Sequence, residues 1–223
     1  MPSLPAPTQA ASAGSPRRRP ALLAAAGIAA FAVSLVACLP AHVVAPDATV
    51  VGTVWHGAAA LPNGAQARWD WSPGASLAHA ALAAATTIDG PDTVVEATTL
   101  WRPGGVGFIA VRGRAGWSLL AAAIPGLPRC TLPLELDLAR VAASGIDGTI
   151  RSRAGVCDEP GGARAVPRLV ATFAGQAGRV TTWTDRATTL AAVGLANGVV
   201  RLHVTPAGAA VLPIGRGDLE VAL

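Results

Sequence analysis

The sequence predicts a mainly β protein: an N-terminal transmembrane helix followed by an open, twisted, largely antiparallel β-sheet domain with one short helix. Three observations support this fold class. Apolar and polar residues alternate with a period of two in several segments. Turn sequences that contain glycine separate these segments. The chain also combines 25 glycines and 18 prolines with only 13% charged residues, a composition typical of many short strands and tight turns.

Period-two alternation indicates strands with one dry and one wet face, as in an antiparallel sheet. Between residues 131 and 138, leucines occupy every even position, and polar residues or proline occupy the odd ones. Residues 199–204 and 219–223 alternate in the same way. We predict strands near 49–56, 65–72, 93–101, 105–113, 130–140, 146–153, 167–174, 177–184, 187–195, 198–205 and 217–223.

Turn chemistry connects these strands. Asn197-Gly198 lies between two apolar segments and is a strong hairpin signal, because a type I′ turn needs positive φ at both central positions. Weaker signals of the same kind are Asp89-Gly90, Asp147-Gly148 and Ala207-Gly208. One helix is predicted at 117–123. The segment 75–88 fits either a helix, which its alanines favour, or another strand.

A membrane segment is predicted at 21–39, which has no charged residue and is bounded by Pro20 and Pro40. As a helix it would extend about 28 Å, close to the thickness of the hydrocarbon core. Three arginines at 17–19 precede it, and no Arg or Lys follows until Arg68. The positive-inside rule therefore predicts a cytoplasmic, basic, disordered tail (1–20), a transmembrane helix (21–39), a linker (40–48) and an exported β-rich domain (49–223).

Two other interpretations of the apolar segment remain open. A basic region followed by a short apolar region is also the mark of a cleaved signal sequence, and residues 35–38 resemble a lipoprotein processing box with Cys38 as the lipidated residue. A buried core helix is the other interpretation, although such a helix usually carries a polar stripe. Both a cleaved signal and a membrane helix place the domain outside the cytoplasm.

Cys130 and Cys157 are the two cysteines of the predicted exported domain. Outside the cytoplasm such a pair is expected to form a disulfide. The disulfide would close a loop of about 28 residues, for which chain entropy gives about 3.5 kcal/mol of stabilisation. Two buried free thiols are the alternative.

Charge and motifs argue against several classes of function. After the three N-terminal arginines, the rest of the chain has 14 basic and 13 acidic residues. It is therefore nearly neutral and lacks the excess of basic charge expected of a nucleic-acid-binding domain. Glu135 and Asp137 share a strand face, but they are more simply explained as its solvated side than as an acid–base pair. The histidines do not have metal-ligand spacing; they are His42, His56, His79 and His203. We therefore predict a non-catalytic protein with no cofactor, metal or small-molecule substrate.

The most distinctive pattern is GTVWHG at 52–57, followed by ARWDWSP at 67–73. The simplest structural interpretation is a cluster of large side chains that anchors the first hairpin. The pattern also resembles protein N of the bacterial type II secretion system (the GspN family) over about residues 50–77. The residues that match this family signature are Gly52, Thr53, Trp55, Gly57, Trp71 and Pro73.

The resemblance implies a single-pass protein of the bacterial inner membrane with a cytoplasmic N-terminus and a periplasmic domain. Its function would be that of a non-catalytic scaffold in the type II secretion system, with other inner-membrane secretion subunits as partners and membrane lipid in contact with 21–39. The alternative is an envelope lipid-handling module, or a lipoprotein anchored at Cys38. A lipid groove needs continuous apolar residues on the face opposite the packed core, whereas residues 131–138 have Thr, Pro, Glu and Asp there, which favours the scaffold.

Overall fold

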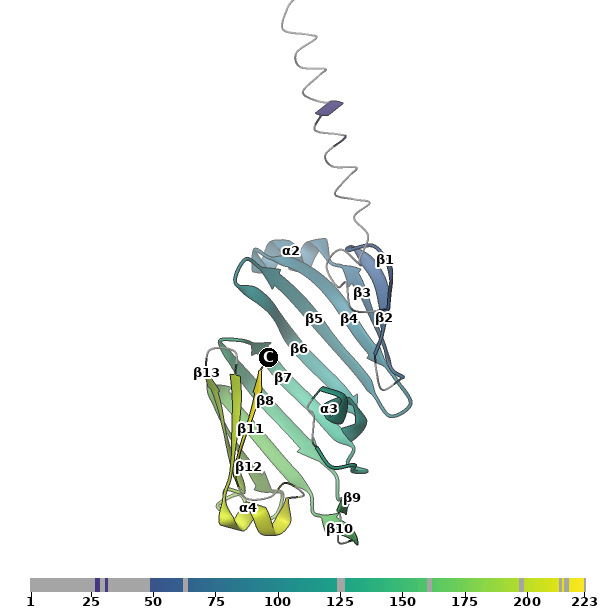
Figure 1. The fold of residues 1–223 in the computed structure, drawn as a ribbon. Helices are drawn as coiled ribbons and strands as arrows, with labels where there is room; N and C mark the ends of the chain where they lie inside the picture. Colours follow the sequence, from purple (N-terminus) through teal and green to yellow (C-terminus); the bar gives the residue numbers. More distant parts are fainter. Residues whose placement is uncertain are drawn as a thin grey trace, which may run out of the picture. The chain divides into compact units, whose positions relative to one another are not determined.

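The computed structural model of the chain (Figure 1) contains two compact units, Met1–Leu39 and Pro40–Leu223. It describes residues 27, 28, 31, 49–61, 64–123, 127–159, 162–196, 199–212, 214 and 217–222. In the first unit, the three described residues are helical and exposed. Within the described part of the chain, no helix is both long and apolar enough to cross a membrane. The predicted tail, the linker, Cys38 and the rest of 21–39 lie outside the described residues.

The second unit is mainly β, as predicted, and is built on one large antiparallel sheet. In the described residues, thirteen strands pair in the order β1 to β8 and then β11 to β15. These strands are β1 (Val50–Gly52), β2 (His56–Ala60), β3 (Gln66–Trp71), β4 (Leu82–Asp89), β5 (Val94–Arg102), β6 (Gly105–Ala115), β7 (Leu134–Ala142), β8 (Gly145–Ser152), β11 (Leu169–Gly175), β12 (Ala177–Thr182), β13 (Ala191–Ala196), β14 (Val199–Val204) and β15 (Gly217–Ala222). Between β8 and β11, the chain forms a separate hairpin of β9 (Gly155–Glu159) and β10 (Gly162–Val166).

Most of the predicted strands are present, and the differences have physical reasons. Segment 49–56 is not one strand, because the chain turns between Gly52 and His56. The ambiguous segment 75–88 contains most of a helix, α2 (Pro73–His79), and then most of β4. The predicted strand 187–195 starts only at Ala191. The β9–β10 hairpin was not predicted, because small and charged residues interrupt its alternation.

The second unit has three short helices among its described residues, instead of the one that was predicted. α3 (Trp117–Ala123) is the predicted helix. α2 and α4 (Pro206–Val211) both begin at a proline, whose missing N–H is not needed in the first turn of a helix. At α4, the Thr205 hydroxyl also accepts a hydrogen bond from the Gly208 N–H at 3.0 Å. The sequence left α2 open as the helical alternative for 75–88 and did not predict α4, because short segments rich in Gly and Ala show no amphipathic period.

Two of the four hairpin signals correspond to hairpins. Gly90 lies in the turn between β4 and β5, where its N–H donates to the Thr93 carbonyl at 2.8 Å. Ala196 and Val199 pair directly at the end of the β13–β14 hairpin, while Asn197 and Gly198 lie outside the described residues. The other two predictions were wrong: Asp147-Gly148 lies within β8, and Ala207-Gly208 lies within α4.

Irregular pairing occurs at the same level in two neighbouring strands near the middle of the sheet. The β5–β6 pairing shifts register at Ala110, which has a positive φ of 52°, and the β7–β8 pairing shifts at Ala139, while the β6–β7 pairing between them keeps its register. An extra residue in a strand bends it and increases its twist. These bulges therefore bend the sheet between its two halves, as its curved outline in Figure 1 shows.

Buried apolar residues form three separate clusters. The largest includes Val95, Val111 and Leu138 from three central strands, with Leu119 and Leu120 of α3 packed against them. A second cluster lies under α4, and a third surrounds Cys157 beside the β9–β10 hairpin. Each cluster thus lies where a helix or hairpin covers part of the sheet.

Candidate functional site: a tryptophan corner and an uncharged sheet face

The family-signature residues first build the turn between β1 and β2. The Thr53 N–H donates to the His56 carbonyl at 2.8 Å. Gly52 has a φ of +101°, and a Cβ added there would lie 2.5 Å from the His56 carbonyl oxygen. Both the dihedral and the close approach require glycine at this position. The GTVWHG sequence is therefore explained locally by a tight turn.

Tryptophans then pack against this turn. A Cβ added at Gly57 would lie 2.4 Å from Cζ2 of Trp69, so the glycine makes room for that ring. The Trp69 indole N–H donates to the Thr53 carbonyl at 3.2 Å. The rings of Trp55 and Trp71 meet edge to face, with their centroids 5.2 Å apart. Residues from both halves of the signature are thus in direct contact.

The second half of the signature also leads into α2. The Trp71 indole N–H donates to Oγ of Ser76 at 3.0 Å, and the Ser76 hydroxyl donates to the Ser72 carbonyl at 2.8 Å. Pro73 is the first residue of that helix. We call this unit the tryptophan corner; it consists of Gly52, Thr53, Trp55, Gly57, Trp69, Trp71, Pro73 and Ser76. The predicted signature residues therefore meet in space, in the hairpin-anchoring arrangement that the sequence predicted.

The tryptophan corner keeps large apolar side chains in solvent. Trp71 is 45% exposed, and Leu77 of α2 is 86% exposed. An exposed indole whose N–H is already bonded within the domain offers an apolar surface with its orientation fixed. The corner can therefore contact a partner without rearranging.

The predicted disulfide is present. Sγ of Cys130 lies 1.99 Å from Sγ of Cys157, which joins the segment before β7 to β9. Backbone hydrogen bonds flank it: the Thr131 N–H donates to the Val156 carbonyl, and the Asp158 N–H donates to the Arg129 carbonyl, both at 2.8 Å. The bond therefore fixes the β9–β10 hairpin to the large sheet.

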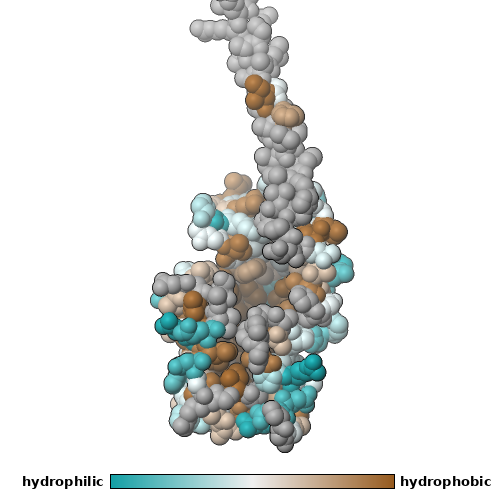
Figure 2. Space-filling model, in the orientation of Figure 1, coloured by the Kyte–Doolittle hydropathy of each residue, from teal (hydrophilic) through white to brown (hydrophobic). Residues whose placement is uncertain are grey.

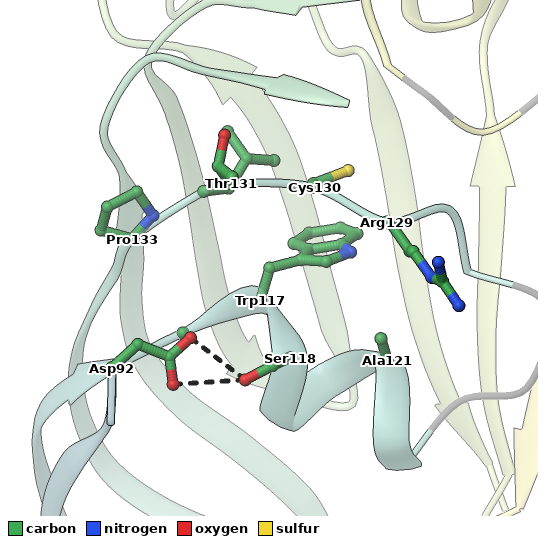
Figure 3. A pocket seen from close by; sticks show the side chains of 10 residues that line it. Asp92, Trp117, Ser118, Ala121, Arg129, Cys130, Thr131 and Pro133 are labelled. Carbon is green, nitrogen blue, oxygen red and sulfur yellow. Dashed lines mark hydrogen bonds between the residues drawn. The ribbon is translucent and has the colours of Figure 1, made fainter. Parts of the chain in front are cut away.

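A pocket of about 840 Å³ lies between α3 and the segment that leads to Cys130 (Figure 3). The Ser118 hydroxyl contacts the two carboxylate oxygens of Asp92 at 3.2 and 3.1 Å. The Trp117 indole N–H donates to the Pro128 carbonyl at 2.7 Å. These hydrogen bonds hold α3 in place, so the polar groups that line the pocket are explained by their structural role.

The other candidate residues from the sequence lie on solvated surfaces. Glu135 pairs with Arg153 at 3.1 Å, and Asp137 pairs with Arg112 at 3.4 Å. Nδ1 of His203 lies 2.7 Å from a carboxylate oxygen of Asp218. No group of three or more potential metal ligands occurs among the described residues, and His42 lies outside them.

The strand register reveals a feature that single segments of sequence did not show. One row of directly paired residues takes one member from each of the thirteen described strands, and every member is apolar or glycine. The row is Val50, Ala59, Ala67, Ile88, Val95, Gly113, Leu136, Ile150, Ala171, Val180, Ala191, Val204 and Gly217. Paired residues share a face, so this row defines what we call the uncharged face.

All charged residues of these thirteen strands, within the described part of the chain, point to the opposite face, which we call the polar face. They are Arg68, Asp70, Asp89, Glu96, Arg102, Arg112, Arg114, Glu135, Asp137, Arg140, Asp147, Arg151, Arg179, Arg201, Asp218 and Glu220. Such a division is typical of a sheet with one dry and one wet face.

Cross-strand ion pairs stabilise the polar face. Arg140 contacts Asp147 at 2.9 Å, and Arg201 contacts Glu220 at 2.8 Å. The pKa of Asp147 is lowered from its usual 3.8, first because its carboxylate accepts the Gly175 N–H at 2.8 Å and then because of Arg140. Some of the charges on this face are thus matched across neighbouring strands.

Only parts of the uncharged face are covered. α3 and α4 pack on it through Leu119, Leu120 and Val211. Val106 and Phe108 lie on the same face but remain 48% and 37% exposed. Figure 2 shows hydrophobic side chains gathered in the hollow of this unit, with hydrophilic side chains beside them. The arrangement could hold an apolar chain without placing any strand charge against it.

The sequence showed the alternation in single strands but not the continuous row, because the row depends on which residues pair across strands.

Comparison of the chain with protein-family models, with curated proteins and with solved structures finds no match.

Proposed function

We propose that this chain is a non-catalytic accessory component of the type II secretion system in the bacterial inner membrane. The observation that carries the proposal is the tryptophan corner, in which the residues that resemble the family signature meet in one unit. Its exposed Trp71, together with the exposed Leu77 of the adjoining α2, offers a contact surface for another secretion subunit of the inner membrane. The uncleaved apolar segment 21–39 would hold the domain at the membrane, on the periplasmic side.

Export measurements test this proposal. Deletion of the gene is expected to reduce the amount of secreted enzyme outside the cell, and the wild-type gene is expected to restore it. A photo-crosslinking residue in place of Leu77 should capture a secretion subunit, because this side chain is 86% exposed. A crosslinker in place of Ala174, on the polar face, is the control. Normal export together with no crosslink to any secretion subunit would refute the proposal.

Envelope lipid handling is the second candidate, and the uncharged face specifically favours it. A peptide in this hollow would place backbone N–H and C=O groups against side chains that offer few hydrogen bonds, at a cost for each unpaired group. An acyl chain has no such groups and gains from the burial of its apolar surface. The chemistry of the face therefore fits an acyl chain better than a peptide.

Two valines with similar exposure allow a matched test. Val106 is 48% exposed on the uncharged face, and Val94 is 50% exposed on the polar face, in the neighbouring strand. The full chain in neutral nanodiscs is irradiated with a fatty acid that carries a diazirine. We expect Val106→Arg to reduce labelling of the domain severalfold and Val94→Arg to leave it unchanged. Equal labelling of the two variants would argue against an acyl-chain site.

A further inference from the structure

A second exposed tryptophan lies on the polar face, far along the chain from the tryptophan corner. Trp183 directly follows β12 and is 43% exposed. The guanidinium carbon of Arg186 lies 5.0 Å from its ring centroid, and that of Arg151 lies 5.9 Å from the same centroid. Two cations thus share one indole, an arrangement in which they repel each other unless an anion is close.

Three arginines near Trp183 carry their charge without an ion pair. On the polar face, some guanidinium groups pair with carboxylates, as in Arg112–Asp137, Arg140–Asp147 and Arg201–Glu220, whereas Arg68, Arg102, Arg114 and Arg179 form no ion pair with a described residue. Arg151, Arg168 and Arg186 likewise form none, and Arg151 and Arg186 are set apart by the exposed indole that they share. Arg168 is exposed, and its backbone adjoins that of Trp183, because its carbonyl accepts the Trp183 N–H at 2.9 Å.

Two carboxylates lie nearby and keep their charge, but neither forms an ion pair with these arginines. Glu135, which lies opposite Arg151 in the sheet, pairs with Arg153, and Asp185 is held by its own loop. Asp185 accepts hydrogen bonds from the Ala187 N–H at 2.9 Å and the Thr188 N–H at 3.2 Å. Bonding to Thr188 and Ala187 lowers the pKa of Asp185 from its usual 3.8. The Thr182 hydroxyl further fixes the turn, accepting the Asp185 N–H at 2.9 Å. The loop therefore holds Arg186 beside Trp183 in a set position.

We propose that Trp183, Arg151, Arg168 and Arg186 form a contact site for the phosphate groups of an anionic lipid surface. Unpaired guanidinium groups attract phosphate, and an indole is favoured at the level of lipid headgroups because it joins an apolar ring to a polar N–H. Neither an acidic peptide nor free phosphate makes equal use of the exposed ring. The site does not depend on the secretion assignment, because it uses residues outside the tryptophan corner.

Vesicle sedimentation tests this site with the full chain. The chain is placed in nanodiscs of phosphatidylcholine and mixed with sucrose-loaded vesicles, either of phosphatidylcholine alone or with phosphatidylglycerol added. We expect the anionic vesicles to sediment the wild-type chain and the neutral vesicles to leave it in solution. Arg151→Gln/Arg186→Gln should weaken binding by roughly thirtyfold, since each arginine near such a surface contributes about fivefold. Adding Trp183→Leu to this double variant should weaken binding to the anionic vesicles further.

Arg68→Gln/Arg114→Gln is the matched control, because it removes the same charge from exposed strand positions elsewhere on the polar face. This variant should retain most of the wild-type binding. Equal sedimentation of Arg151→Gln/Arg186→Gln and the wild type would overturn the site. So would complete displacement by inorganic phosphate at constant ionic strength, which indicates a free-anion site, or capture by polyglutamate but not by vesicles, which indicates an acidic protein partner.

Discussion

At the scale of single residues, two glycines and two indole N–H groups account for the tryptophan corner. Gly52 supplies a backbone conformation that L side chains rarely adopt, and Gly57 leaves space for Trp69. The indole N–H groups of Trp69 and Trp71 bond to Thr53 and Ser76. The Trp69 contacts join the first turn to β3, and the Trp71 bond joins β3 to α2, so the corner connects three successive segments.

Gly57→Ala is predicted to destabilise the domain by about 1–3 kcal/mol, because the added methyl group would overlap the Trp69 ring in a packed site. Gly74→Ala is the matched control: it lies in α2, and nothing lies within 4 Å of a Cβ added there. Chemical denaturation of the two variants measures the difference. Equal midpoints for both would show that the corner relaxes freely.

Asp147→Asn is predicted to reduce stability at neutral pH but not in acid. The folded state lowers the pKa of Asp147 below 3.8, so its ionised carboxylate stabilises the fold above that value. That contribution is lost as the pH falls through the lowered pKa. Thermal unfolding of both proteins from neutral pH to below pH 3.8 should show a difference that shrinks toward acid. A difference independent of pH would exclude this linkage.

At the scale of elements, short helices and one hairpin cover parts of a long sheet. α3 packs on the central strands, α4 packs on the later ones, and the β9–β10 hairpin is held by the disulfide. The sheet itself is a meander in which tight turns join some neighbouring strands, whereas α2, α3, the β9–β10 hairpin and α4 lie between others. Local turn chemistry therefore decides most of the topology.

Cys130→Ser/Cys157→Ser is predicted to destabilise the domain by about 3.5 kcal/mol, from the loop-closure entropy that the bond removes from the unfolded chain. Hydrogen exchange should show the largest loss of protection in β9, because the backbone hydrogen bonds there flank the Cys130–Cys157 disulfide. Treatment of the native protein with a thiol reagent under non-reducing conditions is the accompanying check. Labelling at both cysteines would contradict the disulfide.

At the scale of the whole second unit, the two faces of the sheet have different chemistry from β1 to β15. Val50 and Gly217 belong to the same apolar row, although they lie at opposite ends of the strand order. The charged strand residues instead lie on the other face, where some of them pair with exposed partners. The division therefore extends over the whole sheet.

Neighbouring alanines in β13 test this division. Ala191→Asp is predicted to destabilise the domain by about 2 kcal/mol or more, because it places a carboxylate between Val180 and Val204. Ala192→Asp should change stability by less than about 0.5 kcal/mol, since its direct neighbours are Arg179 and His203 on the polar face. Denaturation midpoints compare the two, and similar losses for both would contradict the assignment of faces.

The sequence alone predicted the mainly β class, most strands, α3 and the cysteine pair. These features depend on local alternation, turn residues and the oxidising environment expected for an exported domain. It also identified the signature residues and predicted a cluster of large side chains at the first hairpin, but it placed a continuous strand at 49–56, where the chain turns between Gly52 and His56. It could not determine the extra helices or the β9–β10 hairpin, since neither carries a periodic apolar pattern.

Only the tertiary structure decided which residues stand side by side across strands. The register of thirteen strands joins positions 50 to 217 into one apolar row, and no segment of sequence contains that information. The same register and loop geometry bring Arg151 and Arg186 to Trp183. A sheet pairs residues that are distant along the chain, so properties of its faces arise from long-range pairing and not from local pattern.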